Sequence, residues 1–315
     1  MIKARGLARR FTTKLGPVDA VRGVDIDVAE GELVGFLGPN GAGKSTTLRM
    51  LTTLLQPTAG EAIVAGHDLL SDPAGVRRNI GYVGQKNGAG ADQRVADELA
   101  LQARFYGLSK HEARRKAGDL LERFELQGME KRAVITLSGG QQRRLDIAMG
   151  MLHDPRLLFL DEPSTALDPQ SRRNLWDHIK QLKADGTTVF LTTHYLDEAD
   201  FLSDRLLVID HGSIVGEGSP DELKNSVSGD LVVLGTPQAA VVATKFPDAV
   251  VEDEKVSFRI PNGDRSLPGL LRDLDNLGVE LHSVQVHRPT LDDVFLTMTG
   301  RSLREETNAG QNYLG

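Results

Sequence analysis

A glycine-rich segment, Gly38-Pro-Asn-Gly-Ala-Gly-Lys-Ser45, constrains the fold of this chain more than any other stretch. It matches the phosphate-loop pattern G-x-x-x-x-G-K-[S/T] at every fixed position. A short apolar run, Glu32–Leu37, precedes it, and the apolar spacing of Thr46–Leu55 is typical of a helix. A glycine turn without a ligand is the competing interpretation, which the Lys-Ser pair at this spacing disfavours. The sequence therefore predicts a strand, a loop and a helix that bind a nucleoside triphosphate.

The chemistry expected of this loop follows from its residue types. Glycines allow backbone N–H groups to turn inward around phosphate oxygens, and the positive end of the following helix dipole lies beneath the same charge. We expect Lys44 to reach the terminal phosphates and the Ser45 hydroxyl to bind Mg²⁺.

Length and composition limit the remaining possibilities. The 315 residues suffice for a large domain and a small one. A formal charge of −7 gives no sign of a nucleic-acid partner, and the absence of cysteine excludes disulfides and cysteine zinc sites. The N-terminus lacks the apolar stretch of a secretion signal, and nowhere do about eighteen uninterrupted apolar residues occur. We expect a cytoplasmic protein whose membrane role requires a separate subunit.

The first half of the chain predicts a β-rich region followed by a helical insertion. Apolar and polar side chains alternate with strand period in Ala20–Val28, and Glu61–His67 reads as another short strand. Helical patterns follow at Val95–Tyr106 and Lys110–Phe124, within an insertion that spans residues 86–135.

Polar side chains follow several apolar strands at the point where each strand ends. Asp161 and Glu162 come directly after Arg156–Leu160, a continuous apolar run that is typical of a buried parallel strand. Taken singly, Gln85 and His194 are more often surface or structural residues, but they also end strand-like segments. Ligands bind at the carboxyl ends of strands in open α/β sheets, so we expect these groups to share one edge. There, an acid can hold Mg²⁺ through water while its neighbour polarises an attacking water.

Two features stay open when the residues are taken alone. A second polar glycine turn, Leu137–Arg144, precedes the helical run Leu145–Met151 and suits either an anion or an ordinary helix cap by Ser138. Neither interpretation is favoured. Phe11 can pack in the core or stack on an adenine ring, and its position alone favours the core.

Taken together, these motifs resemble the ATP-binding cassette family, the motor subunits of ABC transporters. The family's motifs occur in their usual order. Walker A is Gly38–Ser45, the Q-loop residue is Gln85 and the signature is Leu137–Gln141. Walker B is Leu158–Asp161 with Glu162, the D-loop is Ser164–Asp168 and the switch histidine is His194. The signature between the Q-loop and Walker B is the most specific feature. The resemblance covers roughly residues 1–225 and implies an α/β P-loop NTPase with a RecA-like core, a β-rich N-terminal subdomain and a helical subdomain at about 86–155.

The resemblance also implies roles for individual residues. Ser45 and Gln85 would bind Mg²⁺ directly, and Asp161 would support the metal through water. Glu162 would polarise the attacking water, while His194 would contact the γ-phosphate and act with Lys44 on the transition state. The preference for Phe11 is reversed, because it is similar to the adenine-stacking aromatic residue of the family. The nucleotide would be held by the Walker A residues Gly38, Pro39, Asn40, Gly41, Ala42, Gly43, Lys44, Ser45 and Thr46.

In this family the signature motif acts across a dimer. Ser138, Gly139, Gly140 and Gln141 of one copy would close over ATP bound to the other copy, so one chain carries half of each complete site. Because all motifs are intact, a symmetric homodimer with two ATP–Mg²⁺ sites is expected. The resemblance implies an ATPase that is peripheral to the cytoplasmic face of the membrane and coupled to a separate transmembrane permease.

The C-terminal part narrows the resemblance. After Pro220–Lys224 a new unit begins, with β-like runs at Asp230–Leu234 and Lys255–Ile260 and a helix at Ser266–Leu277. This arrangement closes on Arg288–Leu296 and resembles the small α+β C-terminal domain of daunorubicin-resistance-type cassettes, whose membrane subunits are of the ABC-2 class. It implies an exporter of drugs or other amphiphiles.

The expected organisation is a cassette at 1–225, an accessory domain at 226–300 and a polar tail at 301–315. Lipid and polysaccharide exporters share these features and remain an alternative, so the substrate is not assigned. A soluble ABC ATPase acting on ribosomes or DNA is disfavoured, because the chain has one cassette and no heptad run. One departure from the family pattern is Ala166, which stands where many cassettes of this group have glycine.

Overall fold

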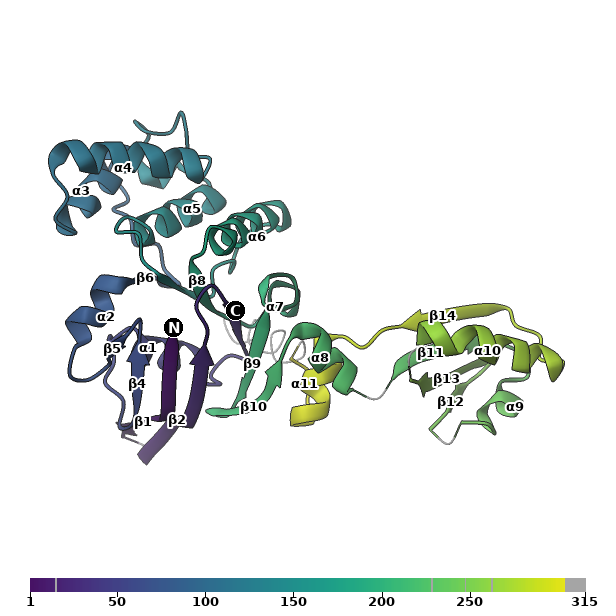
Figure 1. Cartoon of the computed structure of the whole chain (residues 1–315). Coiled ribbons are helices and arrows are strands. Elements are labelled where there is room, and N and C mark those ends of the chain that lie inside the picture. The colour runs from purple at the N-terminus through teal and green to yellow at the C-terminus, as the bar shows by residue number, and fades with distance from the viewer. Residues whose placement is uncertain (15, 228, 247, 262, 304–315) are drawn as a thin grey trace. The chain divides into compact units, whose positions relative to one another are not determined.

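The computed structural model describes residues 1–303 apart from positions 15, 228, 247 and 262. The described residues form two compact units, 1–219 and 220–303 (Figure 1). The boundary expected after residue 225 falls inside α8 (Pro220–Ser226), a helix that packs against α11 (Leu291–Thr299) of the second unit. The polar tail expected at 301–315 lies outside the described residues from position 304 onward.

An antiparallel sheet forms the β-rich part of the first unit. Its strands lie in the order β2-β1-β4-β5, and β1 and β2 form a long hairpin. Alternate side chains such as Ile2, Ala4 and Ile26 are buried, as the strand-period alternation predicts. The strands are β1 (Ile2–Thr13), β2 (Gly16–Val28), β4 (Ala59–Val64) and β5 (His67–Asp68).

A six-stranded sheet lies at the centre of the first unit. Its order is β10-β9-β3-β8-β7-β6, and the strands from β9 to β6 are parallel, while β10 is antiparallel at one edge. Every residue of β3, β7 and β8 is buried. The apolar runs of β3 and β7 predict this burial, whereas β8 also buries three threonines. The strands are β3 (Leu33–Leu37), β6 (Ile80–Val83), β7 (Leu157–Asp161), β8 (Thr188–Thr193), β9 (Arg205–Asp210) and β10 (Ser213–Gly218).

The core between these sheets is aromatic at its centre. Phe190 of β8 contacts Phe36 of β3 and Phe159 of β7, with ring centroids 5.6 and 5.7 Å apart. Tilted aromatic pairs of this kind add about 0.5–1.5 kcal/mol to the burial of their area. The strands β3, β7 and β8, which carry the candidate site, therefore share one hydrophobic cluster that holds them together.

Four helices accompany the central sheet. The helix predicted over Thr46–Leu55 begins earlier, at Lys44, and ends at Leu51, since Thr53 has a left-handed backbone with a φ of 64°. The patterns above do not predict α6, although Asp168 caps it and a proline occupies its first turn. The helices are α1 (Lys44–Leu51), α2 (Pro73–Asn79), α6 (Pro169–Ala184) and α7 (Leu196–Leu202).

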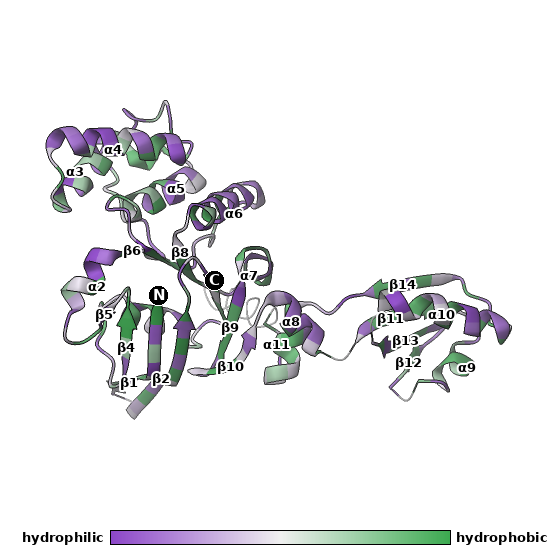
Figure 2. Cartoon of the chain, viewed as in Figure 1, coloured by the Kyte–Doolittle hydropathy of each residue, from purple (hydrophilic) through white to green (hydrophobic). Residues whose placement is uncertain are grey.

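The helical subdomain follows the pattern of its sequence. Ser109 and Ser138 each begin a helix with a reciprocal capping box, formed with Glu112 and Gln141. Hydrophilic residues cover the outer faces of α4 and α6 (Figure 2). The elements are α3 (Val95–Phe105), α4 (Lys110–Arg123), a 3-10 turn η1 (Val134–Thr136) and α5 (Gly139–Gly150).

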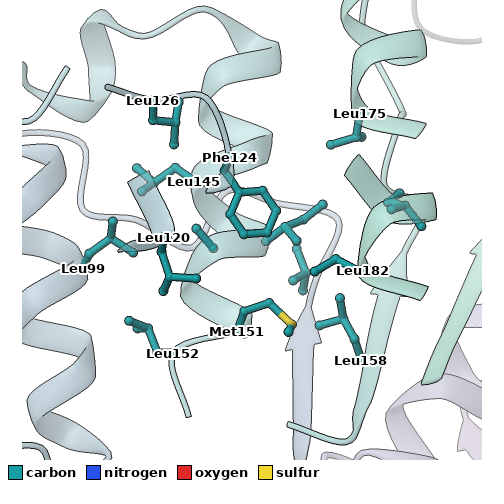
Figure 3. Packing of buried hydrophobic residues seen from close by; sticks show 14 of the residues in the cluster. Leu99, Leu120, Phe124, Leu126, Leu145, Met151, Leu152, Leu158, Leu175 and Leu182 are labelled. Atoms are coloured by element: carbon teal, nitrogen blue, oxygen red, sulfur yellow. The ribbon is translucent and has the colours of Figure 1, made fainter. Parts of the chain in front are cut away.

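The subdomain shares one hydrophobic core with the central sheet. Phe124 and Leu145 from the subdomain pack in the same cluster as Leu158 of β7 and Leu182 of α6 (Figure 3). This continuous packing supports α5 next to the strand that carries Asp161.

The second unit contains a separate antiparallel sheet in the order β12-β13-β11-β14. Its core includes Val232, Leu234, Val256, Phe258 and Leu274. The predicted strands at 230–234 and 255–260 are present, whereas the patterns do not predict the short β12 and α9. The elements are β11 (Asp230–Gly235), α9 (Ala239–Ala243), β12 (Val250–Glu252), β13 (Lys255–Ile260), α10 (Gly263–Asn276) and β14 (Ser283–His287).

Candidate nucleotide-binding site

The predicted phosphate loop connects β3 to α1, at the carboxyl end of a central parallel strand. Two of its glycines are required by their surroundings. A Cβ on Gly43, whose φ is 108°, would lie 2.5 Å from the carbonyl oxygen of Ala20, and one on Gly38 would lie 2.2 Å from that of Ile209. The loop backbone therefore passes against β2 and β9 at distances that exclude any side chain.

The first turn of α1 supplies backbone donors to the loop. Gly43 is the N-cap, and its carbonyl accepts the first helical hydrogen bond, from the Thr47 amide at 2.9 Å. Helix geometry leaves the amides of Lys44, Ser45 and Thr46 without an intrahelical partner. Together with the positive end of the helix dipole, these amides form a site suited to an anion.

Lys44 lies over the loop and is only 4% exposed. Its Nζ donates to the carbonyl oxygens of Gly38 and Pro39 at 2.8 and 2.9 Å and lies 3.4 Å from Oε1 of Glu162. Burial lowers the pKa of Lys44 below its ordinary value, although the negative charges of Glu162 and Asp161 oppose this shift.

Asp161 connects three elements of the site. Its Oδ1 accepts a hydrogen bond from Ser45 Oγ of α1 at 2.9 Å and another from Thr192 Oγ1 of β8 at 2.7 Å. The carboxylate is 1% exposed. The predicted convergence of the phosphate loop with the end of β7 is thus present in the structure, and Thr192 is an additional member that the sequence patterns do not identify.

Glu162 is held in an uncommon conformation at the end of β7. Its φ is 47°, in the left-handed region that non-glycine residues seldom occupy. Its amide donates to both oxygens of Thr192, the hydroxyl at 3.0 Å and the carbonyl at 3.1 Å. This backbone turns the carboxylate toward Lys44 and His194.

His194 completes the group on the same edge. Its Nδ1 lies 3.3 Å from Oε2 of Glu162. Burial raises the pKa of Glu162, but the contact with His194 and the Lys44 charge outweigh it, so the pKa lies below its ordinary value. Glu162 is therefore ionised at neutral pH.

The structure does not bring every predicted residue into this group. Gln85 is exposed in the loop after β6. Among the described residues, no hydrogen bond or ion pair joins Ser138, Gly139, Gly140 or Gln141 to Lys44, Ser45, Asp161 or Glu162. Ser138 caps α5, as the capping interpretation predicts, and lines a cavity of about 410 Å³ with Gly140, Asp168 and Ser171.

Phe11 lies outside the buried core. Its ring is half-buried on β1, with the Arg9 guanidinium 4.7 Å from the ring centroid. Arg9 pairs with Val21 of β2, whose side chain lies next to the position of Gly43 in the phosphate loop. Because the Phe11 side chain is only partly buried, the interpretation of Phe11 as a core residue is not supported.

Two family models match the chain. Residues 21–165 match the model described as ABC transporter, and residues 218–299 match the model of the ATP-binding protein DrrA1-3-like C-terminal domain.

Similar proteins extend over nearly the whole chain. The doxorubicin resistance ATP-binding protein DrrA of Mycobacterium tuberculosis (strain H37Rv) is 42% identical over 305 residues, which cover 92% of this chain and 91% of the relative. The daunorubicin resistance ATP-binding protein DrrA3 of Streptomyces coeruleorubidus is 43% identical over 310 residues, covering 96% and 97%. The chain belongs to the DrrA-like ATP-binding proteins of ABC transporters. This DrrA-like ATPase is accordingly an ATP-binding and ATP-hydrolysing subunit.

Solved structures agree with this assignment for the cassette. A dimeric ATP-binding cassette in a post-hydrolysis state, bound to ADP and phosphate, is 28% identical with a TM-score of 0.64, covering 70% of this chain and 98% of its own. The predicted P-loop α/β fold is confirmed. Every helix in the described part of the DrrA-like ATPase is too short or too polar to cross a membrane.

Proposed function

We propose that two copies of this chain bind and hydrolyse ATP with Mg²⁺ and thereby energise the export of drugs or other amphiphiles through a separate ABC-2 type membrane subunit. The observation that carries the proposal is a sequence identity above 40% to drug-resistance ATP-binding proteins over more than nine-tenths of the chain. In this proposal residues 1–219 are the motor, and the second unit is an accessory domain.

The phosphate loop is proposed to hold the triphosphate. The amides of the first turn of α1 face the phosphates, and Lys44 exchanges its contacts with the loop carbonyls and Glu162 for the terminal phosphates. Such an exchange is favourable because terminal phosphates carry more negative charge than the two neutral carbonyls and the single carboxylate that Lys44 leaves.

The residues near Ser45 fit a Mg²⁺ ion. The Ser45 hydroxyl and the Asp161 carboxylate are hard oxygen donors, 2.9 Å apart, beside the phosphate loop. We propose that Ser45 and Gln85 bind the ion directly and that Asp161 supports it through water. The ion would neutralise charge that develops on the phosphates.

Glu162 is proposed as the group that polarises the attacking water. Its carboxylate is ionised, shielded from solvent and held by Lys44 and His194 at the end of β7. When Lys44 turns to the phosphates, Glu162 loses one charge partner and becomes a better acceptor for the water proton. His194 is then placed to contact the γ-phosphate.

The two parts of each complete site are proposed to come from different copies. Ser138, Gly139, Gly140 and Gln141 present the start of α5, and in the part of the chain that the structure describes no hydrogen bond or ion pair joins them to the phosphate loop. The similar cassette bound to ADP and phosphate is dimeric, which supports closure of the signature motif of one copy over the nucleotide of the other. Phe11 is proposed to stack on the adenine.

The membrane subunit is proposed to dock beside the loop that carries Gln85. A cavity of about 180 Å³ is lined by Tyr82, Lys86 and Tyr106, and Phe105, which directly precedes Tyr106 at the end of α3, is 75% exposed. Exposed aromatic side chains around a hollow favour an apolar protein segment. Docking here would place the partner against the loop that links the nucleotide site to the helical subdomain.

The docking surface can be tested with the complex itself. Phe105→Glu is expected to abolish co-purification with the ABC-2 type subunit, while Leu54→Glu, at an apolar residue that is 58% exposed elsewhere, is expected to retain it. Equal retention by both variants would place the partner on another surface.

The substrate class rests on the relatives alone. The linearmycin resistance ATP-binding protein LnrL of Bacillus subtilis (strain 168) is 33% identical over 315 residues. The Nod factor export ATP-binding protein I of Ralstonia nicotianae is 35% identical over 314 residues, so the relatives are not confined to drug-resistance proteins. A lipid or polysaccharide exporter is kept as the second candidate.

The deciding experiment is ATP turnover of the chain reconstituted with its membrane subunit, measured across amphiphilic drugs, lipids and glycans. We expect stimulation by drugs and its loss in Glu162→Gln. Stimulation confined to lipids or glycans would reject drug export, and the absence of any co-purifying membrane subunit would reject the transporter assignment.

A further inference from the structure

Arg143 lies on the second turn of α5 and is 5% exposed. Its Nε donates to the carbonyl oxygen of Pro163 at 2.8 Å, and its Nη2 donates to that of Asp161 at 3.1 Å. Both acceptors are main-chain carbonyls, and they belong to the residues on either side of Glu162. A single guanidinium thus clamps the backbone that carries the proposed base.

The same side chain reaches the loop of Gln85. Arg143 Nη1 donates to the carbonyl oxygen of Gly84 at 2.6 Å, one residue before Gln85. Asp146, one turn further along α5, lies 3.9 Å from the guanidinium and accepts from the Gly88 amide at 3.0 Å. Both ends of the Gln85 loop are therefore tied to the helix that begins at Ser138.

These contacts account for the unusual backbone of Glu162. A left-handed conformation at a non-glycine residue costs of order 1–3 kcal/mol and persists only where the surroundings impose it. Buried carbonyls without a hydrogen-bond partner are also unfavourable, and Arg143 donates to the carbonyls of Asp161 and Pro163 on either side of the turn. A lysine could not do so, because its ammonium lacks the planar fork that reaches three acceptors.

We propose that Arg143 is a positioning residue for catalysis: it holds Glu162 and the Gln85 loop in fixed relation to the signature helix of the same chain. Through this clamp, a displacement of α5 when Ser138 meets the nucleotide of the second copy is transmitted to the base. The inference rests on the proposed function, because it assigns Glu162 the role given above.

The proposal predicts a separation of turnover from binding. In the purified full chain, Arg143→Met is expected to lower kcat about 100-fold, since a displacement near 1 Å can cost that much. The Kd for a fluorescent ATP analogue is expected to change less than about threefold, since Lys44 and the α1 amides remain intact. Arg143→Lys should restore only a small part of the turnover. Normal kcat in Arg143→Met would overturn the inference.

Arg205→Met is the matched control. Arg205 also makes several contacts, with Glu32 at 2.7 Å and with Glu217, but it lies where β9 begins, at the end of the sheet away from the phosphate loop. This variant is expected to lose stability and keep kcat. An equal loss of kcat in both variants would show that Arg143 acts only on stability and would contradict the proposal.

A double variant tests whether Arg143 acts through Glu162. If it does, adding Arg143→Met to Glu162→Gln should change the residual single-turnover rate less than about twofold, because residues that act as a unit are not additive. A full 100-fold further loss would show an independent role and contradict the proposal.

Hydrogen exchange supplies a readout that does not depend on turnover. Arg143→Met should accelerate exchange in peptides covering 81–90 and 158–166, whereas Arg205→Met should not. Unchanged exchange would overturn the clamp even if the wild-type chain hydrolysed ATP normally. Conversely, a wild-type chain that never hydrolyses ATP would refute the proposed function, while the exchange result would still decide the clamp.

Discussion

Lys44 Nζ and Glu162 Oε1 lie 3.4 Å apart in a buried ion pair that joins the phosphate loop to the end of β7. The proposed phosphate-binding cation and the proposed base thus neutralise each other, with side chains 4% and 9% exposed. A nucleotide that takes Lys44 would separate this pair. Phosphate binding and activation of the base are therefore coupled through one contact.

Glu162→Gln is expected to lower ATP turnover at least 100-fold, because the amide cannot accept the proton of the attacking water. ATP affinity should stay the same or rise several-fold, since Lys44 no longer has to leave a carboxylate. Steady-state ATPase assays and titration with a fluorescent ATP analogue measure the two effects. Wild-type turnover in this variant would contradict the assignment of Glu162 as the base.

The pH dependence of stability should carry the signature of Glu162. Its pKa is lowered in the folded protein, so its contribution is fully present above the unfolded value near 4.5 and is lost as pH falls through the folded pKa. The difference in unfolding free energy between wild type and Glu162→Gln should shrink as the pH is lowered below about 4.5. Urea unfolding from pH 6 to pH 3.5 measures it. A difference that stays constant across this range would contradict the cited contacts.

Ala166 provides a backbone prediction. Its φ is 63°, in the left-handed region that glycine adopts at no steric cost. Ala166→Gly relieves about 1–2 kcal/mol of left-handed strain and loses about 0.5–1 kcal/mol through chain entropy, so it should be neutral or slightly stabilising. Ala166→Val should destabilise. Chemical unfolding measures both, and Ala91→Gly, in a loop without a left-handed φ, is the control that should lose stability.

Sequence patterns predict the residues proposed to act on the nucleotide better than the residues that hold them in position. Asp161 and Glu162 follow a continuous apolar run, so their place at the end of a buried parallel strand is foreseeable. Thr192 and Arg143 carry no such signal, because a threonine in a β-branched strand and an arginine in a helix are ordinary there. Their roles arise from acceptors that lie 18 to 59 residues away in sequence and meet them only in the folded chain.

The extent of helices and the start of the second unit are similarly set by packing. The helix predicted to end at Leu55 stops at Leu51, where a left-handed Thr53 follows, and no periodic pattern encodes that turn. Likewise α8 packs against α11, although 64 residues lie between Ser226 and Leu291 along the chain. Local patterns cannot reveal such a partner.

The last prediction concerns Glu198, a residue of α7, the helix that follows His194 in the chain. This carboxyl group on α7 is fully buried and accepts a hydrogen bond from Trp176 Nε1 at 3.0 Å. Burial raises the pKa of Glu198, against the opposing effect of the Trp176 hydrogen bond and of the nearby hydroxyl groups of Thr193 and Ser164. The charged form is therefore disfavoured in the fold.

Because its folded pKa is raised, Glu198 binds its proton more tightly in the native state, and its contribution to stability falls as pH rises from about 4.5 through the folded pKa. Glu198→Gln, which keeps the shape and stays neutral, should gain stability relative to wild type over that window. Glu198→Ala should lose about 2–4 kcal/mol at pH 5, since it leaves a cavity and an unsatisfied indole N–H, and this loss should become smaller at pH 8 as the wild-type contribution falls. Urea unfolding of the three proteins at pH 5 and pH 8 measures these differences, and a Gln variant that loses stability as pH rises, relative to wild type, would show that Glu198 is held as a carboxylate.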